Sequence, residues 1–346
     1  MRGRRALHVG VAGATGMVGR EFLELLAKRA FPMDSLRLFA SSRSAGRQIP
    51  VRLRPDGPAA PVVVEDLAKA DPGGLDLIFF SAGGATAREH APRFAAAGAV
   101  VVDNSSAFRE DPEVPLVVPE INPGALASPR RDAGYIIANP NCSTIIMLLP
   151  LAPLHVAFGI REVIVSTYQA VSGAGRAALD DLVGQARSFA RGEPEECRFY
   201  DEPIFMNLLP FIGEPAAGGD CTEERKMRIE TRRILEDDSI GIYATTVRVP
   251  VERCHSESVF VRLRRETTDE EVRALLADTP GVVLADRPTP RALARREDVF
   301  VGRVRVDEAD RRVVRFWVVS DQLWKGAALN AIQIGEVLLE QGRWTR

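Results

Sequence analysis

The chain has 346 residues, more than one ordinary hydrophobic core usually holds, and we therefore expect two domains. Its apolar fraction of 46% and charged fraction of 27% are typical of a soluble globular protein. A net charge of -2, without an acidic or basic tail, gives no electrostatic reason to expect a nucleic acid or a membrane as partner.

The cysteines and the start of the chain indicate the cellular setting. The basic start, Met1–Arg5, leads into a predicted strand and turn instead of the longer apolar segment of a secretory signal. No apolar run approaches the roughly 20 residues that a membrane-spanning helix needs. Cys142, Cys197, Cys221 and Cys254 lack the paired spacing of a disulfide framework or a zinc site. We expect a cytoplasmic enzyme with reduced thiols and no metal.

A glycine-rich turn follows the first predicted strand, Ala6–Ala12, and precedes an amphipathic helix with Phe22 and Leu26 on its apolar face. Glycines let the backbone approach a pyrophosphate, and the helix N-terminus supplies unpaired N–H groups. We predict a dinucleotide-binding turn, and the alternative is a turn that only permits tight packing. The residues assigned to the cofactor are Gly10, Gly13, Thr15, Gly16, Met17 and Val18.

The end of the second predicted strand, Ser35–Ala40, indicates which dinucleotide binds. A protein that selects NAD usually has an acidic residue there for the ribose 2′-hydroxyl. Here Ser41, Arg43 and Ser44 offer donors for a phosphate and no acid is present. NADP is therefore favoured, and a solvated loop arginine is the alternative.

Two further apolar strands, Leu75–Phe80 and Val100–Val102, are linked by a predicted helix over Ala85–Ala97. Ser81 follows the first strand and the run Asp103-Asn-Ser-Ser106 follows the second. Open α/β sheets bind ligands at these carboxyl ends, and we assign Ser81 to the cofactor.

Cys142 is the candidate nucleophile. The segment Tyr135-Ile-Ile-Ala-Asn139-Pro140-Asn141-Cys142-Ser143-Thr144 joins a strand to an apolar helix predicted over Thr144–Ala157. A position at or near a helix N-terminus lowers the pKa of a thiol and favours the attacking thiolate. Backbone N–H groups at the helix start, or the Asn141 amide, are candidates for an oxyanion hole. The alternative is a buried structural cysteine.

His255 is the histidine best placed to exchange a proton with Cys142. The other three lie inside predicted elements of the fold, namely His8 in the first strand, His90 in a helix and His155 in the apolar helix. His255 opens an alternating strand, Ser258–Leu263, on which it faces away from Cys254. We interpret it as a general base, and a satisfied structural histidine is the alternative.

Five motifs occur along the chain in a fixed order. They are Asn139-Pro-Asn-Cys142-Ser-Thr, Tyr168-Gln169-Ala-Val-Ser172-Gly173-Ala-Gly175, Thr222-Glu223-Glu-Arg-Lys226-Met, Arg248-Val-Pro…His255-Ser256 and Lys325-Gly-Ala-Ala-Leu-Asn330. Together they resemble the aspartate-β-semialdehyde dehydrogenase family over nearly the whole chain, from Gly10 to Gly335.

The resemblance implies a substrate, L-aspartyl 4-phosphate, that carries a phosphate, a carboxylate and an ammonium group. It makes Arg109 and Lys226 phosphate ligands, Arg248 the fork onto the α-carboxylate, and Glu223 the partner of the amino group. Glu223 and Lys226 share a face at the start of a helix predicted over Glu223–Leu235, where an exposed ion pair is the alternative.

The resemblance also implies roles for the remaining polar residues. Gln169, which ends the predicted strand Val163–Tyr168, resembles a substrate-positioning glutamine. Ser172, Gly173 and Gly175 are expected to form a flexible loop that contacts the cofactor. Gln322 matches an amide near the nicotinamide.

The implied reaction is the NADPH-dependent reduction of the acyl phosphate to aspartate 4-semialdehyde. Cys142 attacks, phosphate leaves, the thioester is reduced, and His255 handles the proton as the hemithioacetal collapses.

The expected fold class is α/β, with a Rossmann-type dinucleotide-binding domain over 1–137 and an α+β catalytic and dimerisation domain over 138–324. Residues 325–346 contain a closing helix, Ala327–Gln341, that by resemblance packs back on the first domain. Strands of the second domain are predicted over Val163–Thr167, Ile240–Val249, Ser258–Leu263 and Val313–Val319. Arg187–Glu202 is polar and unassigned, and Arg287–Asp298 is predicted as a surface loop.

The resemblance implies homodimers or tetramers that form through the second domain. The expected partners are therefore a second copy of the chain, the small substrate and phosphate. The nearest rival activity is that of N-acetyl-γ-glutamyl-phosphate reductase, whose acetylated amine is uncharged and would leave Glu223 without a purpose. A catalytically inactive NADP-binding relative is the other rival, against which the intact set of Cys142, Gln169, Arg248 and His255 argues.

Overall fold

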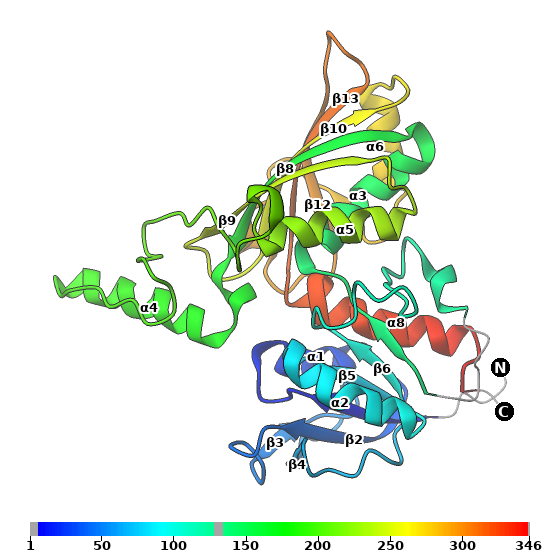
Figure 1. Ribbon diagram of the computed structural model, residues 1–346, viewed down its shortest axis with the longest axis vertical. Helices are drawn as coiled ribbons and strands as arrows, with labels where there is room; N and C mark the ends of the chain where they lie inside the picture. The colour runs from blue at the N-terminus through cyan, green and yellow to red at the C-terminus, as the bar shows by residue number, and fades with distance from the viewer. Residues whose placement is uncertain (1–5, 128–133, 345–346) are drawn as a thin grey trace. The chain divides into compact units, whose positions relative to one another are not determined.

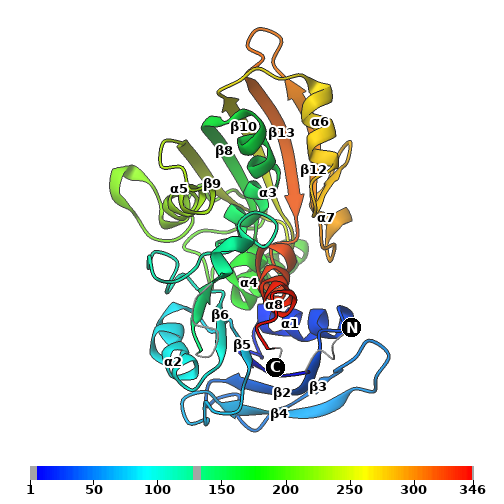
Figure 2. The same cartoon turned by 90° about the vertical axis from the view of Figure 1, so that its right-hand side faces the viewer.

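The computed structural model describes residues 6–127 and 134–344, and the basic start Met1–Arg5 lies outside the described residues. The chain divides into two compact units, Met1–Pro140 with Ala327–Arg346, and Asn141–Gly326 (Figures 1 and 2). These divisions lie close to the predicted boundaries after residues 137 and 324. Within the described ranges, every helix is too short or too polar to cross a membrane.

The first unit is built on a seven-stranded sheet with the strand order β3-β4-β2-β1-β5-β6-β7. All neighbours are parallel except β3 and β4, which are antiparallel. The strands are β1 (Leu7–Ala12), β2 (Met33–Ala40), β3 (Gln48–Val51), β4 (Ala60–Asp66), β5 (Leu77–Phe80), β6 (Val100–Asp103) and β7 (Ile136–Ala138). The chain passes to one side of β1 for β2 and to the other side for β5, which creates the switch point where open sheets bind ligands. The predicted Rossmann-type topology is confirmed.

Helices cover both faces of this sheet (Figure 2). They are α1 (Met17–Lys28), α2 (Gly84–Ala96) and α8 (Leu329–Glu340), with a 3-10 turn over Pro123–Leu126. Phe80 of β5 packs edge-on against Phe94 of α2, with ring centroids 5.7 Å apart. Phe79 points to the opposite face because strand residues alternate, and it stacks on Phe22 of α1 at 4.8 Å. Consecutive residues of one strand thus fill two separate cores.

The C-terminal helix α8 belongs to the first unit although the whole second unit precedes it in the chain. Arg29, directly after α1, makes two hydrogen bonds of 2.7 Å to the carboxylate of Glu336 on α8. Gln333 of the same helix donates to Glu120 at 2.9 Å. The first unit is therefore assembled from both ends of the chain.

The second unit contains a six-stranded sheet with the order β11-β12-β13-β10-β8-β9. Its strands are β8 (Ile160–Ala170), β9 (Gly241–Val249), β10 (His255–Leu263), β11 (Val282–Leu284), β12 (Val299–Val306) and β13 (Val313–Ser320). β10 is antiparallel to both of its neighbours, β8 and β13, whereas β8 and β9 are parallel. This mixed sheet confirms the α+β class predicted for the second domain.

One face of this sheet is covered by helices and the other carries exposed apolar side chains. The helices of the unit are α3 (Cys142–Phe158), α4 (Arg176–Arg191), α5 (Thr222–Leu235), α6 (Asp269–Ala277) and α7 (Pro290–Leu293), with 3-10 turns over Val171–Ala174 and Ala217–Gly219. α3 packs against β8, β10, β12 and β13, while α5 packs against β9. α4 projects away from the sheet (Figure 1).

Several expected boundaries are wrong. α3 begins at Cys142, two residues before the predicted start, because Asn141 caps it. The expected loop Arg287–Asp298 contains the single-turn helix α7. The closing helix begins at Leu329, and a π-helical turn, Trp324–Ala328, precedes it.

The helix α4, to which the sequence analysis assigned no structure, ends at Arg191 inside the polar segment Arg187–Glu202. Gly192 terminates it with φ +68°, in the left-handed region that glycine adopts without strain. Its buried face comprises Ala178, Leu179 and Leu182 at helical spacing, together with the polar residues Asp181 and Gln185. Asp181 and Gln185 accept backbone N–H groups of residues 198–205, which explains why polar side chains are buried there.

Candidate active site

The glycine-rich turn lies at the carboxyl end of β1, at the switch point of the first unit. Gly13 has φ +82°, and a Cβ atom there would lie 2.1 Å from the carbonyl oxygen of Ser81. A Cβ on Gly19 would lie 2.1 Å from the Gly13 carbonyl oxygen, so both glycines are required for the turn to pack against α1 and the end of β5. Gly16 is the N-cap of α1 without a side-chain cap, which leaves first-turn N–H groups for an anion.

The loop after β2 carries the residues predicted to distinguish the two dinucleotides. Ser41 and Arg43 are exposed and Ser44 is half-buried, in a turn closed by the hydrogen bond from Ser44 N to Ser41 O at 2.8 Å. A phosphate donor set at the end of β2 is therefore accessible to solvent. No carboxylate lies between residues 41 and 47, and the preference for NADP over NAD stays a prediction.

Arg109 connects the ends of two strands of the first unit. Its Nε donates to the carbonyl oxygen of Asn139 at 2.9 Å and its Nη2 to that of Asn104 at 2.7 Å. Asn330 of α8 donates to the Asn139 side chain at 2.7 Å and to Val117 O at 3.0 Å. Asn330, from the last of the five motifs, therefore fixes Asn139, the first residue of the motif that contains Cys142. The sequence did not indicate this structural role.

Cys142 is the first residue of α3, as its predicted position near a helix start requires. Asn141 is the N-cap, and its side-chain oxygen accepts the N–H of Thr144 at 3.1 Å. Cys142 is partly exposed, whereas Cys221 and Cys254 are buried. Gly326 lies against it, since a Cβ there would be 2.8 Å from the Cys142 Cβ. The helix start stabilises a negative charge on the sulfur of Cys142.

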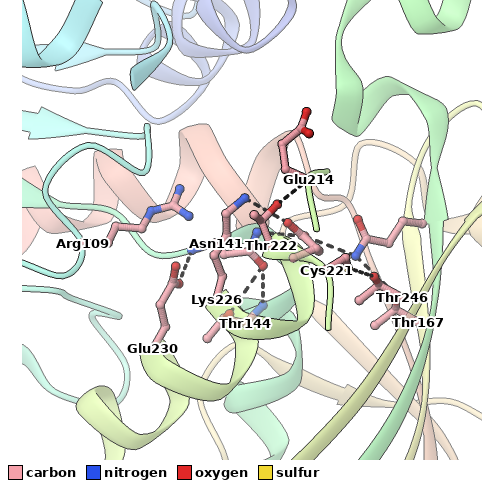
Figure 3. A network of polar contacts seen from close by, with 12 residues as sticks. Arg109, Asn141, Thr144, Thr167, Glu214, Cys221, Thr222, Lys226, Glu230 and Thr246 are labelled. Atoms are coloured by element: carbon pink, nitrogen blue, oxygen red, sulfur yellow. Dashed lines mark hydrogen bonds and ion pairs between the residues drawn. The ribbon is translucent and has the colours of Figure 1, made fainter. Parts of the chain in front are cut away.

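Asn141 also joins α3 to α5 (Figure 3). Its Nδ2 donates to Glu223 Oε1 at 2.9 Å, and its backbone N–H donates to Glu230 Oε2 at 2.6 Å. The Asn141 backbone N–H and one hydrogen of its side-chain amide thus have acceptors on α5, and the Thr144 N–H is used by the cap. The assignment of the oxyanion hole to N–H groups at the start of α3 or to the Asn141 amide stays a prediction.

Glu223 and Lys226 are not the exposed ion pair that was the alternative interpretation. Glu223 is buried, and its carboxylate accepts from Lys226 Nζ at 3.2 Å and from Gln169 Nε2 at 3.3 Å. Burial alone would raise the pKa of Glu223, but Lys226, the Asn141 amide and Arg248 together lower it below its ordinary value. Glu223 is thus a buried carboxylate that stays ionised.

Gln169, Arg248 and His255 lie on three adjacent strands and share the helix-covered face of the sheet. Gln169 and Arg248 are paired in the β8–β9 register. Ser256 of β10 is paired with Tyr168 of β8. Because the two strands are antiparallel, the preceding residue, His255, lies opposite the following residue, Gln169. All three side chains are buried. The parallel and antiparallel pairings thus create one row of polar side chains, which sequence spacing could not show.

The surroundings of His255 decide its protonation. Its Nδ1 accepts the N–H of Ala170 at 3.0 Å, so the neutral ring carries its proton on Nε2. Nε2 is buried and has no hydrogen-bond partner among the described residues. Burial, followed by the positive charge of Arg248, lowers the pKa of His255 well below its ordinary value. His255 is therefore neutral, with an Nε2–H group that can donate a hydrogen bond.

Gly173 lies against both the Arg248 guanidinium and the His255 imidazole, where its missing side chain leaves room for the two groups. A Cβ on Gly173 would lie 3.1 Å from His255 Nε2 and 3.1 Å from Arg248 Nη1. Arg248 is fixed by the hydrogen bond from Nη1 to Ala170 O at 2.8 Å. A side chain at position 173 would therefore displace both functional groups.

Ser172 and Gly173, expected in a flexible loop, lie in a 3-10 turn, Val171–Ala174. Gln322 Nε2 donates to Ser172 Oγ at 2.6 Å, and Gln322 Oε1 accepts the N–H of Cys254 at 2.8 Å. Cys254 has φ +72°, an uncommon conformation for a residue with a side chain. Gln322 thus holds both the turn and the residue before His255, while its predicted contact with a nicotinamide stays a prediction.

Comparison with known proteins extends over both units. Residues 8–128 match the family described as "Semialdehyde dehydrogenase, NAD binding domain", and residues 151–325 match "Semialdehyde dehydrogenase, dimerisation domain". The aspartate-semialdehyde dehydrogenase of Aquifex aeolicus is 44% identical over 342 residues, covering 96% of this chain and 98% of that protein.

Solved structures agree with these sequence matches. Aspartate semialdehyde dehydrogenase II from Vibrio cholerae, complexed with ASA, has a TM-score of 0.92 and 43% identity, covering 97% of this chain and 99% of that chain. The aspartate semialdehyde dehydrogenase of Candida albicans, solved with NADP, has a TM-score of 0.75 and 27% identity, covering 98% of this chain and 99% of that chain.

A Rossmann-type unit with a dinucleotide turn, followed in the chain by a dimerisation domain with a cysteine at a helix start, defines an oxidoreductase of the semialdehyde dehydrogenase class. The matches are long and close enough to name the family. The chain belongs to the aspartate-semialdehyde dehydrogenase family, and the resemblance found in the sequence is confirmed.

Proposed function

We propose that the protein is an NADPH-dependent aspartate-semialdehyde dehydrogenase, which converts L-aspartyl 4-phosphate into L-aspartate 4-semialdehyde and phosphate through a thioester on Cys142. One observation carries the proposal. Asn141, the N-cap of the helix that begins at Cys142, donates its side-chain N–H to Glu223, a buried ionised carboxylate. Asn141 thereby positions both the nucleophile, Cys142, and Glu223, which is the proposed partner of the substrate ammonium group.

The substrate is recognised by opposite charges. Glu223 binds the α-ammonium group of the substrate. The guanidinium of Arg248 binds its α-carboxylate through two N–H groups. Lys226 binds the phosphate, and Arg109 stays a predicted ligand of the same group. Gln169 donates to Glu223 and Thr167 through Nε2, so its Oε1 remains to orient the substrate.

The chemistry begins when the Cys142 thiolate attacks the acyl carbon. The oxyanion is stabilised by N–H groups in the first turn of α3, and its collapse expels phosphate and leaves a thioester. The reduced nicotinamide, when bound, supplies a hydride to the thioester carbonyl. The Nε2–H group of His255 donates a hydrogen bond to the resulting oxyanion, which collapses to the aldehyde as the C–S bond breaks and Cys142 leaves as a thiolate.

We assign the cofactor to the turn Gly13–Val18 and the loop Ser41–Ser44. The uncapped start of α1 supplies N–H groups for the pyrophosphate, and the exposed guanidinium of Arg43 suits the 2′-phosphate of NADP. The relative from Candida albicans, solved with NADP, supports this choice.

The second copy of this chain is the proposed macromolecular partner. The uncovered face of the second sheet exposes Ile164, Tyr168 and Tyr243, of which Tyr243 is 60% exposed. The match to a dimerisation domain supports a homodimer through this face, because an exposed apolar sheet face otherwise promotes aggregation.

The test is a turnover assay with phosphate, NADP and aspartate semialdehyde, which runs the reaction in reverse. We expect NADPH formation to require phosphate and to stop after thiol alkylation, and Cys142→Ser to lose at least about a thousandfold in kcat. Near-normal turnover by Cys142→Ser would overturn the thioester. A preference for the N-acetyl-γ-glutamyl semialdehyde would overturn the substrate.

A further inference from the structure

The turn between β13 and α8, residues 321–326, reaches the surroundings of both reacting side chains. Gly326 lies against Cys142, where an added Cβ atom would be 3.3 Å from the Cys142 Cα. Gln322, near the other end of the turn, accepts the N–H of Cys254 at 2.8 Å, and β10 begins at the next residue. The 321–326 turn therefore contacts the start of α3 at one end and the loop before β10 at the other.

Asp321 anchors this turn with a carboxylate that is fully buried. Its Oδ1 accepts the N–H groups of Leu323 at 3.0 Å and Trp324 at 3.3 Å. Its Oδ2 accepts from Arg253 Nε at 2.6 Å and from the N–H of Arg295 at 2.7 Å. A carboxylate offers about four lone-pair sites, so these four hydrogen bonds use the acceptor capacity of Asp321.

Arg253 connects the anchor to the loop before β10. Its side chain is 13% exposed, and its Cζ atom lies 5.9 Å from the ring centroid of Trp324. Cys254 follows with φ +72°, and a residue with a side chain keeps such a conformation only where its surroundings hold it. Here the turn holds it twice, because Asp321 binds Arg253 and Gln322 binds Cys254.

The 3-10 turn Val171–Ala174 holds the same loop from another side. The N–H of Val171 donates to Val251 O at 2.9 Å, and the Ser172 hydroxyl donates to Glu252 O. Gln322 Nε2 donates to Ser172 Oγ at 2.6 Å, which joins the 3-10 turn to the 321–326 turn. The backbone that leads into β10 is therefore fixed by hydrogen bonds to two separate segments.

We propose that Asp321 is a positioning residue, which sets the separation of Cys142 and His255 by holding the 321–326 turn against the start of α3 and the loop before β10. The reaction depends on this separation, because the oxyanion on the carbon attacked by Cys142 must lie within hydrogen-bond reach of His255 Nε2. Since its acceptor sites are used, Asp321 binds no part of the substrate. The catalytic consequence rests on the proposed function, whereas the coupling of the two segments through the turn does not.

Two substitutions break the anchor in different ways. Arg253→Met removes the guanidinium and keeps most of the side-chain volume. Asp321→Asn keeps an oxygen for the backbone N–H groups of the turn but directs amide hydrogens at the donors of Arg253. We expect each to lower kcat roughly ten- to hundredfold, while the KM for aspartate semialdehyde and phosphate stays within about threefold. The double variant should lose no more than the slower single variant, because both changes remove one contact.

A conservative variant and a distant ion pair separate positioning from stability. Arg253→Lys keeps the positive charge, so its kcat should lie between those of Arg253→Met and wild type. Arg29→Met removes the pair formed with Glu336 at 2.7 Å, and should lower Tm without changing kcat. An Arg253→Lys protein as slow as Arg253→Met, or a higher KM without a lower kcat, would overturn the proposal.

Nuclear magnetic resonance gives a readout that needs no substrate. The chain has four cysteines, so selective ¹⁵N labelling of cysteine places one backbone probe at the start of α3, Cys142, and one before β10, Cys254. We expect Arg253→Met and Asp321→Asn to move both of these signals and to leave that of Cys197, after α4, in place. Arg253→Lys, the mildest change, should move the same two signals by less, and the control variant should move neither.

The two measurements distinguish failure of this inference from failure of the proposed function. A Cys142 signal that stays in place when that of Cys254 moves would overturn the positioning role, even if wild type turned over aspartate semialdehyde. Movement of both signals, in a protein whose wild type does not turn over aspartate semialdehyde, would confirm the coupling through the turn and refute only the proposed function.

Discussion

Three buried ionisable side chains of the second unit differ in charge because their neighbours differ. Glu223 is ionised, because Lys226, Asn141 and Arg248 together outweigh the effect of burial on its pKa. His255 is neutral, because burial and Arg248 lower its pKa. Burial and the charge of Glu223 raise the pKa of Glu257, which favours its neutral form. Opposite shifts on neighbouring groups are a frequent property of catalytic sites.

At the residue scale, Arg43 should determine the cofactor preference. We expect Arg43→Ala to raise the KM for NADPH by about tenfold or more, because a charge-assisted contact to the 2′-phosphate is lost, and to leave the KM for NADH nearly unchanged. Steady-state kinetics with both cofactors measure this. Arg47→Ala, also exposed in the same segment, is the control. Equal losses with NADH and NADPH would show that Arg43 does not contact the phosphate.

At the element scale, the start of α3 combines a helix cap with a binding site. Asn141 caps the helix through Thr144 and reaches Glu223 and Glu230 on α5. The cap fixes where the helix begins, and the contacts to α5 fix where that end lies beside Glu223. One residue therefore sets both the stability of the helix end and the surroundings of Cys142.

Asn141→Ala should reduce both properties. We expect a loss of about 1–2 kcal/mol in the free energy of unfolding from the missing cap, together with slower alkylation of Cys142 by iodoacetamide. Urea denaturation and alkylation kinetics measure the two effects.

A second helix of the chain provides the control for this variant. Thr268 caps α6 by accepting the N–H of Glu271 at 3.1 Å, and Thr268→Ala should cost similar stability without slowing alkylation. Unchanged alkylation in Asn141→Ala would separate the cap from the reactivity of Cys142.

At the scale of the whole molecule, each unit has its own sheet, and the two sheets differ in how their faces are covered. The first sheet has helices on both faces, as parallel sheets require. The second sheet leaves Ile164, Tyr168 and Tyr243 exposed on one face. An antiparallel or mixed sheet tolerates one open face, and this is the face that we propose a second copy covers.

Tyr243→Asp tests the proposed dimer. A charge in the centre of an apolar interface is costly to bury, so we expect a shift from dimer to monomer and a loss of activity that follows the dimer fraction. Size-exclusion chromatography with light scattering measures the mass. Val156→Asp, at a side chain 84% exposed on α3, should leave the mass unchanged. A Tyr243→Asp protein with the mass of wild type would exclude this face.

The sequence by itself determined the features that depend on neighbours in the chain. The glycine turn after β1, the position of Cys142 at a helix start and the absence of an acid near Arg43 are local, because turn geometry and helix ends are set by a few consecutive residues. The order of the five motifs was enough for the family. The motifs did not reveal α4, although Ala178, Leu179 and Leu182 recur at helical spacing along its buried face.

Only the tertiary structure decided which distant residues meet and what charge they carry. The register of β8, β9 and β10 sets His255 beside Gln169 and Glu257 beside Thr167, and no spacing along the chain reveals a register between strands. Protonation follows from burial and from charges that folding brings close. Sequence spacing therefore left the protonation of His255 open and did not single out Glu257.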